Sequence, residues 1–325
     1  MKFHQGPETD HFDGQHFYNS GSGLRGTGSV LRWLANRKPG PWRKWVDEPP
    51  GAPPPERVAG GEIRATFVGH STVLIQMDGM NIVCDPIWSM RASPFSWIGP
   101  RRHRAPGIRF EDLPPIDIVL QSHDHYDHLD VATVSRITSK WHSKFVVPLG
   151  LRARFTRKNI APLELISELD WWESVEVRSN LKITSVPASH FSGRSLNDRN
   201  KTLWCGYVIE GPKATVYFAG DTGYGSHFQE IKRRFPRIRL AFLPIGAYIP
   251  QWFMGPVHIS PADAVRAHEE LGAATSIGIH FGTFALADDG EDEPVEELQR
   301  AMNARKPSKP FLTLSSGEGR NFTAE

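Results

Sequence analysis

Short apolar runs separated by turn residues dominate the chain from residue 64 onward. These runs are rich in Val, Ile and aromatic residues, and most end at Gly, Pro, Asp or Ser, which is typical of β-strands. We therefore predict strands at 65–68, 73–77, 81–84, 116–120, 144–147, 183–186, 203–209, 215–219, 240–244 and 276–279.

Three helices are predicted between the later strands from their capping signals. Asp130 precedes an apolar stripe of helical spacing, and Ser226 with Gln229 indicates a capping box. Ser260 before Pro261 opens a third helix. Strands that first form hairpins and then mix with helices predict an α/β sandwich, with helices outside two sheets.

The first 60 residues have a different composition. Seven prolines stand between Lys38 and Gly61, and such a run stays extended. We predict a surface arm over 1–60 and one main domain over 61–325. Within the arm, Trp33 and Leu34 lie in a short basic, apolar segment. Its apolar residues either dock the arm onto the main domain, which we favour, or contact a membrane interface.

Composition narrows the function classes. The 38 Lys and Arg residues nearly balance 36 Asp and Glu, so a net charge of +2 argues against a nucleic-acid partner. Apolar stretches fall short of the roughly 20 residues needed to cross a bilayer, and the polar start predicts no secretory signal. Two cysteines, Cys84 and Cys205, fit a reducing compartment, so we expect a cytoplasmic protein.

The candidate chemistry centres on one histidine-rich segment between a predicted strand and a predicted helix. It contains His123, His125, Asp127 and His128, at the carboxyl end of a strand, where α/β folds place their sites. Three imidazoles and a carboxylate suit zinc, with manganese or iron as alternatives. A solvated loop that merely contains histidines would seldom produce this spacing by chance.

Three further candidates follow other predicted strands. His190, Asp221 and His280 each come just after a strand and have small residues nearby. Each alone would be read as an ordinary buried histidine or a turn aspartate, but together they complete a ligand set. The set is His123, His125, Asp127, His128, His190, Asp221 and His280.

This ligand set resembles that of the metallo-β-lactamase superfamily of binuclear hydrolases. The resemblance implies a four-layered αββα sandwich over the main domain. It assigns His123, His125 and His190 to a first metal, Asp127, His128 and His280 to a second, and Asp221 to both.

A narrower resemblance rests on short motifs that run in order through most of the chain. They are VGHSTV (68–73), DPI (85–87), RASP (91–94), LPPID (113–117), HDHYDHLD (123–130), LDWW (169–172), LND (196–198), GDTGY (220–224), PIGAY (244–248), WFM (252–254) and HFGTF (280–284). Together they resemble the N-acyl-phosphatidylethanolamine-hydrolysing phospholipase D family.

That resemblance implies cleavage of N-acylphosphatidylethanolamine to N-acylethanolamine and phosphatidic acid. Two zinc ions would share a hydroxide that attacks phosphorus, while Asp127 and Asp221 hold the metals and orient it. Tyr126 and His258 would touch the phospholipid. From the residues alone, Tyr126 could simply pack under its loop, and His258 could hydrogen-bond at a helix start.

The resemblance also bears on partners. It implies a phospholipid substrate at a membrane surface, and it allows peripheral membrane association and a homodimer. The membrane-contact candidates are Trp33, Leu34, Trp252, Phe253 and Met254. Two alternatives stay open: a lactonase or other small phosphodiester hydrolase using the same metals, and a non-catalytic peripheral lipid-binding protein.

Overall fold

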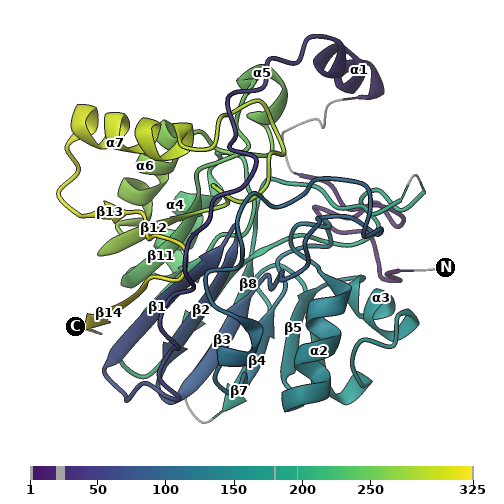
Figure 1. Ribbon diagram of the computed structural model, residues 1–325. Coiled ribbons are helices and arrows are strands. Elements are labelled where there is room, and N and C mark those ends of the chain that lie inside the picture. Colours follow the sequence, from purple (N-terminus) through teal and green to yellow (C-terminus); the bar gives the residue numbers. More distant parts are fainter. Residues whose placement is uncertain (1–2, 20–25, 179–180, 196, 324–325) are drawn as a thin grey trace.

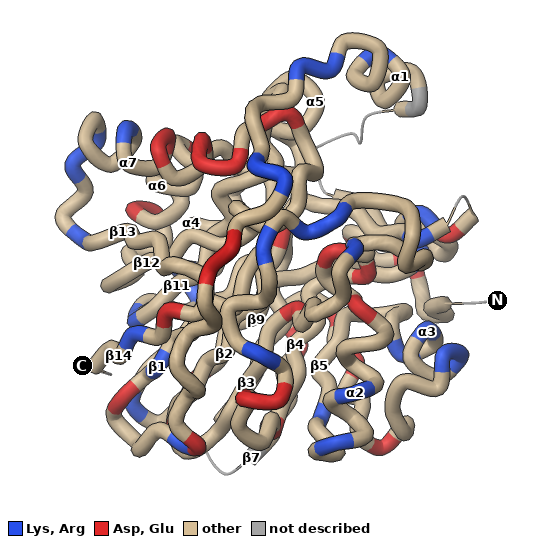
Figure 2. The backbone as a smooth tube through the Cα atoms, viewed as in Figure 1, with Lys and Arg blue, Asp and Glu red and all other residues tan. Residues whose placement is uncertain are grey.

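The computed structural model describes residues 3–19, 26–178, 181–195 and 197–323. Two seven-stranded sheets face each other, and helices cover their outer faces (Figure 1). The predicted αββα sandwich is therefore confirmed. Basic and acidic residues are intermingled along the chain in Figure 2, in keeping with the small net charge.

The first sheet has helices α2 (Val131–Trp141) and α3 (Leu151–Arg157) on its outer face. Its strands, in spatial order, are β14 (Gly319–Thr323), β1 (Glu62–Gly69), β2 (Thr72–Met77), β3 (Met80–Cys84), β4 (Ile118–Leu120), β5 (Lys144–Pro148) and β6 (Ile166–Leu169). Strands β3 to β6 are parallel, so the loops that follow them open at one edge.

The second sheet carries helices α4 (His227–Arg234), α6 (Pro261–Leu271) and α7 (Glu293–Arg305). Its order is β13 (Phe311–Leu312), β12 (Thr275–Ile279), β11 (Ile238–Pro244), β10 (Thr215–Phe218), β9 (Gly206–Glu210), β8 (Leu181–Val186) and β7 (Ser174–Arg178). Two short 3₁₀ turns, η1 (Phe110–Asp112) and η2 (Leu163–Leu165), lie in connecting segments.

The main core lies between the two sheets. Ile75, Leu120, Tyr207 and Phe242 are fully buried there, because the inner faces of both sheets are apolar. Strands covered on both sides carry near-continuous apolar runs, which explains why the sequence signals them so clearly. This core fixes the strand ends from which the candidate ligands project.

Several sequence predictions differ from the structure in detail. The capping box at Ser226 is wrong, because Ser226 already has helical backbone angles and its side chain makes no cap hydrogen bond. The predicted strand at 203–209 begins only at Gly206, since Cys205 N–H instead donates to the Ser122 carbonyl. The caps at Asp130 and Ser260 are confirmed.

The N-terminal 60 residues contain one helix, α1 (Thr27–Ala35), within their described part. Helix α1 lies beside α5 (Gln251–Met254) at one end of the molecule (Figure 1). The Pro-rich stretch that follows runs over the surface, and Arg37 and Arg43 pair with Asp288 and Glu291. The division into an arm and a main domain stays a prediction.

Among the described residues, we find no helix that combines the length and apolar character required to span a bilayer.

Candidate active site

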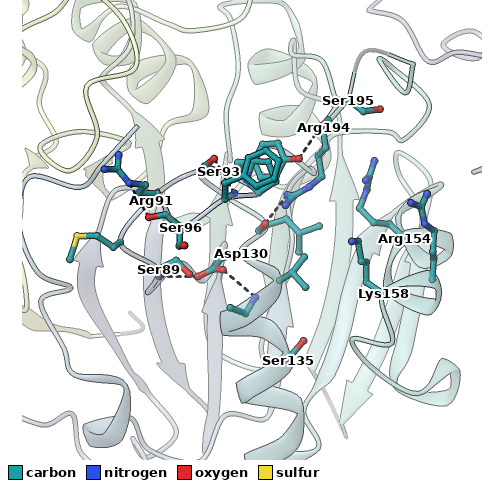
Figure 3. A pocket seen from close by; sticks show the side chains of 18 of the residues that line it. Ser89, Arg91, Ser93, Ser96, Asp130, Ser135, Arg154, Lys158, Arg194 and Ser195 are labelled. Atoms are coloured by element: carbon teal, nitrogen blue, oxygen red, sulfur yellow. Dashed lines mark hydrogen bonds between the residues drawn. The ribbon is translucent and has the colours of Figure 1, made fainter. Parts of the chain in front are cut away.

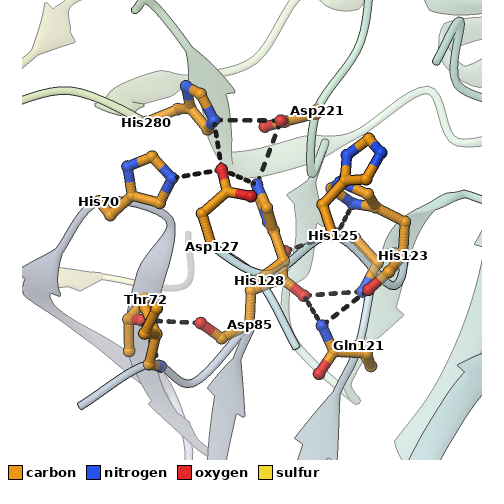
Figure 4. Close-up of polar contacts among 12 residues, drawn as sticks. His70, Thr72, Asp85, Gln121, His123, His125, Asp127, His128, Asp221 and His280 are labelled. Atoms are coloured by element: carbon orange, nitrogen blue, oxygen red, sulfur yellow. Dashed lines mark hydrogen bonds and ion pairs between the residues drawn. The ribbon is translucent and has the colours of Figure 1, made fainter. Parts of the chain in front are cut away.

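The loops after β4, β8, β10 and β12 meet at one edge of the sandwich, and all seven predicted ligands lie there. The site is deeply buried: His123, His128 and His190 are at most 1% exposed. Figure 4 shows how the candidate side chains labelled there converge from different elements. The set is His123, His125, Asp127, His128, His190, Asp221 and His280.

Three imidazoles form the first group of donors. His123 Nε2 lies 2.9 Å from His125 Nδ1, and His190 Nε2 lies 3.2 Å from the same nitrogen. His190 is oriented from its other side, since its Nδ1 lies 2.9 Å from the Val257 carbonyl. Three ring nitrogens therefore face one small volume.

The second group contains Asp127, His128 and His280. Asp127 Oδ2 lies 3.4 Å from His128 Nε2 and 3.5 Å from His280 Nε2. Asp221 lies between the two groups: its Oδ2 is 3.1 Å from both of those nitrogens and 3.8 Å from His190 Nε2.

Burial and neighbouring charges shift the pKa values in opposite directions. Burial and nearby imidazoles hold the pKa of His123 well below its usual value, so its lone pair is available. Burial also disfavours charge on His280, but Asp221 and Asp127 outweigh it and raise the pKa to about 9. Although burial alone would raise the pKa values of both aspartates, the facing histidines hold them well below the usual range. The site thus requires positive charge beside Asp127 and Asp221.

The donor atoms fit metal cations in that position. Asp221 Oδ1 is buried without a hydrogen-bond partner, which is costly unless another group satisfies it. Imidazole nitrogens with carboxylate oxygens are the ligands that zinc and similar divalent ions prefer.

Close backbone approach makes this convergence possible. Gly220, just before Asp221, has φ of +61°, and a Cβ there would meet the Ser122 side chain at 2.6 Å. His70, Asp85 and His280 also adopt positive φ, which is uncommon outside glycine. Strain of this kind concentrates at functional sites.

Two buried residues behind the ligands received no role from the sequence. His70 Nε2 lies 3.0 Å from Asp127 Oδ2, and Asp85 Oδ2 lies 2.7 Å from His128 Nδ1 (Figure 4). Both residues directly follow strands, as the candidate ligands do, and this placement is the sequence signal that could have identified them as part of the site.

Tyr126 lies within the metal-ligand loop, and His258 lies beside Asp221. His258 Nδ1 is 3.9 Å from Asp221 Oδ2, and burial lowers the pKa of His258 to about 4. The Tyr126 hydroxyl donates to the Arg194 carbonyl at 2.9 Å, and the Arg194 guanidinium lies 3.8 Å above its ring. Their contact with substrate stays a prediction.

A cavity of about 650 Å³ adjoins Tyr126, between segment 89–96, the start of α2 and the end of α3 (Figure 3). Its lining is rich in cations, and its two carboxylates are already bonded to the protein: Asp130 caps α2, and Asp198 pairs with Arg154. The cationic side chains are Arg91, Arg154, Arg157, Lys158 and Arg194.

The apolar residues of α1 and α5 divide into packed and exposed ones. Trp33 stacks on Phe253 at 5.0 Å and donates its indole N–H to Asp288, so it docks α1 onto the main domain. Leu31 and Leu34 are 62% and 53% exposed.

Residues 80–281 match the family described as the β-lactamase superfamily domain. An N-acyl-phosphatidylethanolamine-hydrolyzing phospholipase D of Caenorhabditis elegans is 41% identical over 264 residues, covering 78% of this chain and 74% of that protein. This chain belongs to that phospholipase D family within the metallo-β-lactamase superfamily. The mitochondrial Saccharomyces cerevisiae protein of the same name is 35% identical over 240 residues, covering 72% of this chain and half of its own length.

A solved structure supports the fold alone. A metallo hydrolase from Ignicoccus hospitalis superposes with a TM-score of 0.61 at 24% identity, covering 80% of this chain and 98% of its own. Taken with the family match, the protein is a metal-dependent hydrolase, and the non-catalytic alternative is set aside.

Proposed function

We propose that this chain is a phospholipase D-type hydrolase that cleaves N-acylphosphatidylethanolamine to phosphatidic acid and an N-acylethanolamine. The convergence of the seven side chains on one buried site carries the proposal. Such a set can hold metal cations, and phosphodiester hydrolysis needs their concentrated positive charge beside the phosphate. The name of the Caenorhabditis elegans relative supports this substrate over other phosphodiesters.

Two zinc ions suit the donor set, with manganese or iron as substitutes. One would be held by His123, His125 and His190, the other by Asp127, His128 and His280, and Asp221 would bridge them. When bound, such ions neutralise the anionic phosphate and lower the pKa of a bound water towards about 7.

The protein's own groups have distinct tasks in this proposal. Asp127 and Asp221, both ionised, orient the attacking water and can hold its proton. The bond from phosphorus to the ethanolamine oxygen breaks as the bond to the water oxygen forms, and the proton passes to the leaving oxygen. His258 is neutral near pH 7 and can donate its N–H to a phosphate oxygen. Tyr126 offers its hydroxyl as a second donor once it leaves the Arg194 carbonyl.

Isotope labelling tests the reaction directly. Purified protein with measured metal content is incubated in H₂¹⁸O with N-acylphosphatidylethanolamine, a lactone and a simple phosphodiester in parallel. We expect preferred turnover of the phospholipid, with ¹⁸O in phosphatidic acid. Label in the N-acylethanolamine would contradict attack at phosphorus, and turnover of the lactone alone would favour the lactonase alternative.

A membrane surface is the proposed place of reaction, because the substrate is a phospholipid. Leu31, Leu34 and Trp252 are exposed on α1 and α5, and the Arg32 guanidinium lies 4.9 Å from the Trp252 ring. Apolar side chains beside a cation suit an anionic interface. The homodimer that the family resemblance allows stays a prediction, and sedimentation of the purified protein would check it.

A further inference from the structure

The N-terminal arm reaches the candidate ligand His190 through one side chain. Asn19 Nδ2 donates to the His190 carbonyl at 2.7 Å, and Asn19 Oδ1 accepts from the His190 N–H at 3.2 Å. The same Oδ1 accepts the Trp204 indole N–H at 3.0 Å. One amide therefore holds both backbone groups of a residue that lies 171 positions further along the chain.

This contact matters because His190 lies in a loop outside the sheet. Strand β8 ends at Val186, and the described residues supply no backbone partner for the His190 N–H or carbonyl. Asn19 fixes the backbone and the Val257 carbonyl fixes ring Nδ1. With both ends held, His190 Nε2 is aimed at the volume that His125 and Asp221 also face.

The segment that carries Asn19 is itself firmly anchored. Phe12 and Phe17 are 2% and 1% exposed, and they pack against Trp204 and its neighbours. Phe17 N–H donates to the Asn200 carbonyl at 2.8 Å. The arm therefore lies directly against the loop that carries His190, and the buried Phe12 and Phe17 fix the chain that leads to Asn19.

We propose that Asn19 is a positioning residue, which acts through His190 on the metal-binding site. The contact requires an amide, since one side chain must donate to a carbonyl and accept from an N–H at once. An aspartate of the same shape would keep the acceptor but turn the donor into a second acceptor, facing the His190 carbonyl. The metal-binding part of this inference rests on the proposed function, whereas the placement of His190 does not.

The matched pair Asn19→Asp and Asn36→Asp tests the proposal. Asn36 also lies in the arm and donates its amide to a carbonyl, but it is exposed and its partner, the Arg32 carbonyl, lies only four positions away. Both variants are loaded with Co²⁺ and Zn²⁺, and metal affinity is measured by chelator competition alongside the Co²⁺ absorption spectrum.

We expect Asn19→Asp to weaken retention of one metal roughly 10- to 100-fold, the range seen when an outer hydrogen-bond partner of a ligand is lost. Its Co²⁺ spectrum should change, while Asn36→Asp matches the wild type. Unchanged affinity and spectrum, with only a lower melting temperature of the metal-free protein, would overturn the proposal and leave Asn19 a structural residue.

A second measurement keeps the test independent of the proposed function. In the metal-free proteins, histidine-selective ¹H–¹⁵N spectra report the surroundings of the His190 ring. We expect the His190 signals to shift in Asn19→Asp and not in Asn36→Asp. If the wild type bound no metal, the proposed function would fail, and these spectra alone would decide the role of Asn19: unshifted signals would refute it.

Discussion

Asp85 holds His128 from behind, with its Oδ2 2.7 Å from His128 Nδ1 and both side chains fully buried. Asp85 also accepts from the Ser122 N–H at 2.7 Å, the Ser122 hydroxyl and the Gln121 amide. With Nδ1 committed to this carboxylate, His128 turns Nε2 toward Asp221. A carboxylate in this place fixes both the tautomer and the direction of the ring.

Replacing Asp85 with Asn should therefore damage the site without removing a candidate ligand. The amide offers one acceptor oxygen where four donors converge, so at least one buried donor loses its partner, at about 1–3 kcal/mol. We expect metal affinity to fall roughly 10- to 100-fold. Chelator competition and thermal unfolding would measure both effects. Asp117→Asn, which alters a more exposed carboxylate that pairs with Arg57, should leave metal affinity unchanged.

Asp221→Asn tests the proposed bridge. Its carboxylate lies within 4 Å of four histidines, so the neutral amide removes the charge that would hold cations on both sides. We expect loss of at least one metal per chain, and a loss of turnover greater than the roughly 100-fold typical of an outer partner. Elemental analysis and far-UV circular dichroism would separate metal loss from unfolding. Two metals per chain with near-normal activity would contradict the assignment.

Local sequence signals predicted the fold and the seven candidates because the strands are buried on both faces and each candidate follows a strand. The same signals did not predict strands or contacts that depend on partners far away in the sequence, or that consist of polar residues. Strand β14, with the sequence GRNFT, becomes a strand only by pairing with β1 across the whole chain. The sequence did not predict the task of Asn19 for the same reason, since that task depends on His190, 171 positions away.

The motifs that carry the family resemblance included His70 and Asp85 but gave neither a task. The task of each depends on which candidate ligand it contacts in the folded protein: His70 contacts Asp127, and Asp85 contacts His128.

Capping signals were less dependable than strand signals. Ser226 fits the sequence pattern of a cap, yet its backbone is already helical and its hydroxyl makes no capping hydrogen bond.

His11 anchors the N-terminal segment to Asp170, with 2.7 Å between His11 Nε2 and Asp170 Oδ1. Ionisation of His11 should therefore make the stability of the protein depend on pH. Burial disfavours charge on His11, but its hydrogen bonds to the Asp170 and Asp10 carboxylates outweigh burial and raise the pKa of His11. A raised pKa in the folded protein means that this stabilisation is fully present below about pH 6.5 and is lost as pH rises through the folded pKa.

Asp170→Asn should therefore destabilise the protein more at pH 5.5 than at pH 9, by on the order of 1 kcal/mol. Urea unfolding of the wild type and the variant at both pH values would measure the difference. An equal loss at both pH values would mean that His11 stays neutral in the folded protein.

Membrane contact through α1 can be separated from packing of α1, because the two tasks fall on different side chains. Leu31 and Leu34 face solvent, whereas Trp33 stacks on Phe253. Burying an exposed leucine in an apolar environment is worth roughly 1.5–3 kcal/mol. We expect the double variant Leu31→Ser, Leu34→Ser to bind anionic vesicles about tenfold or more weakly, with unchanged melting temperature and unchanged hydrolysis of a soluble phosphodiester.

Two single variants complete that experiment. Leu163→Ser removes a similarly exposed leucine, 48% exposed, from η2 and should leave vesicle binding intact. Trp33→Ser should lower the melting temperature, because it removes the stacking and the hydrogen bond to Asp288. If the double leucine variant binds vesicles as the wild type does, α1 is not the membrane contact. If it loses stability instead, as Trp33→Ser should, the two leucines pack against the protein in solution and the whole of α1 is a docking element.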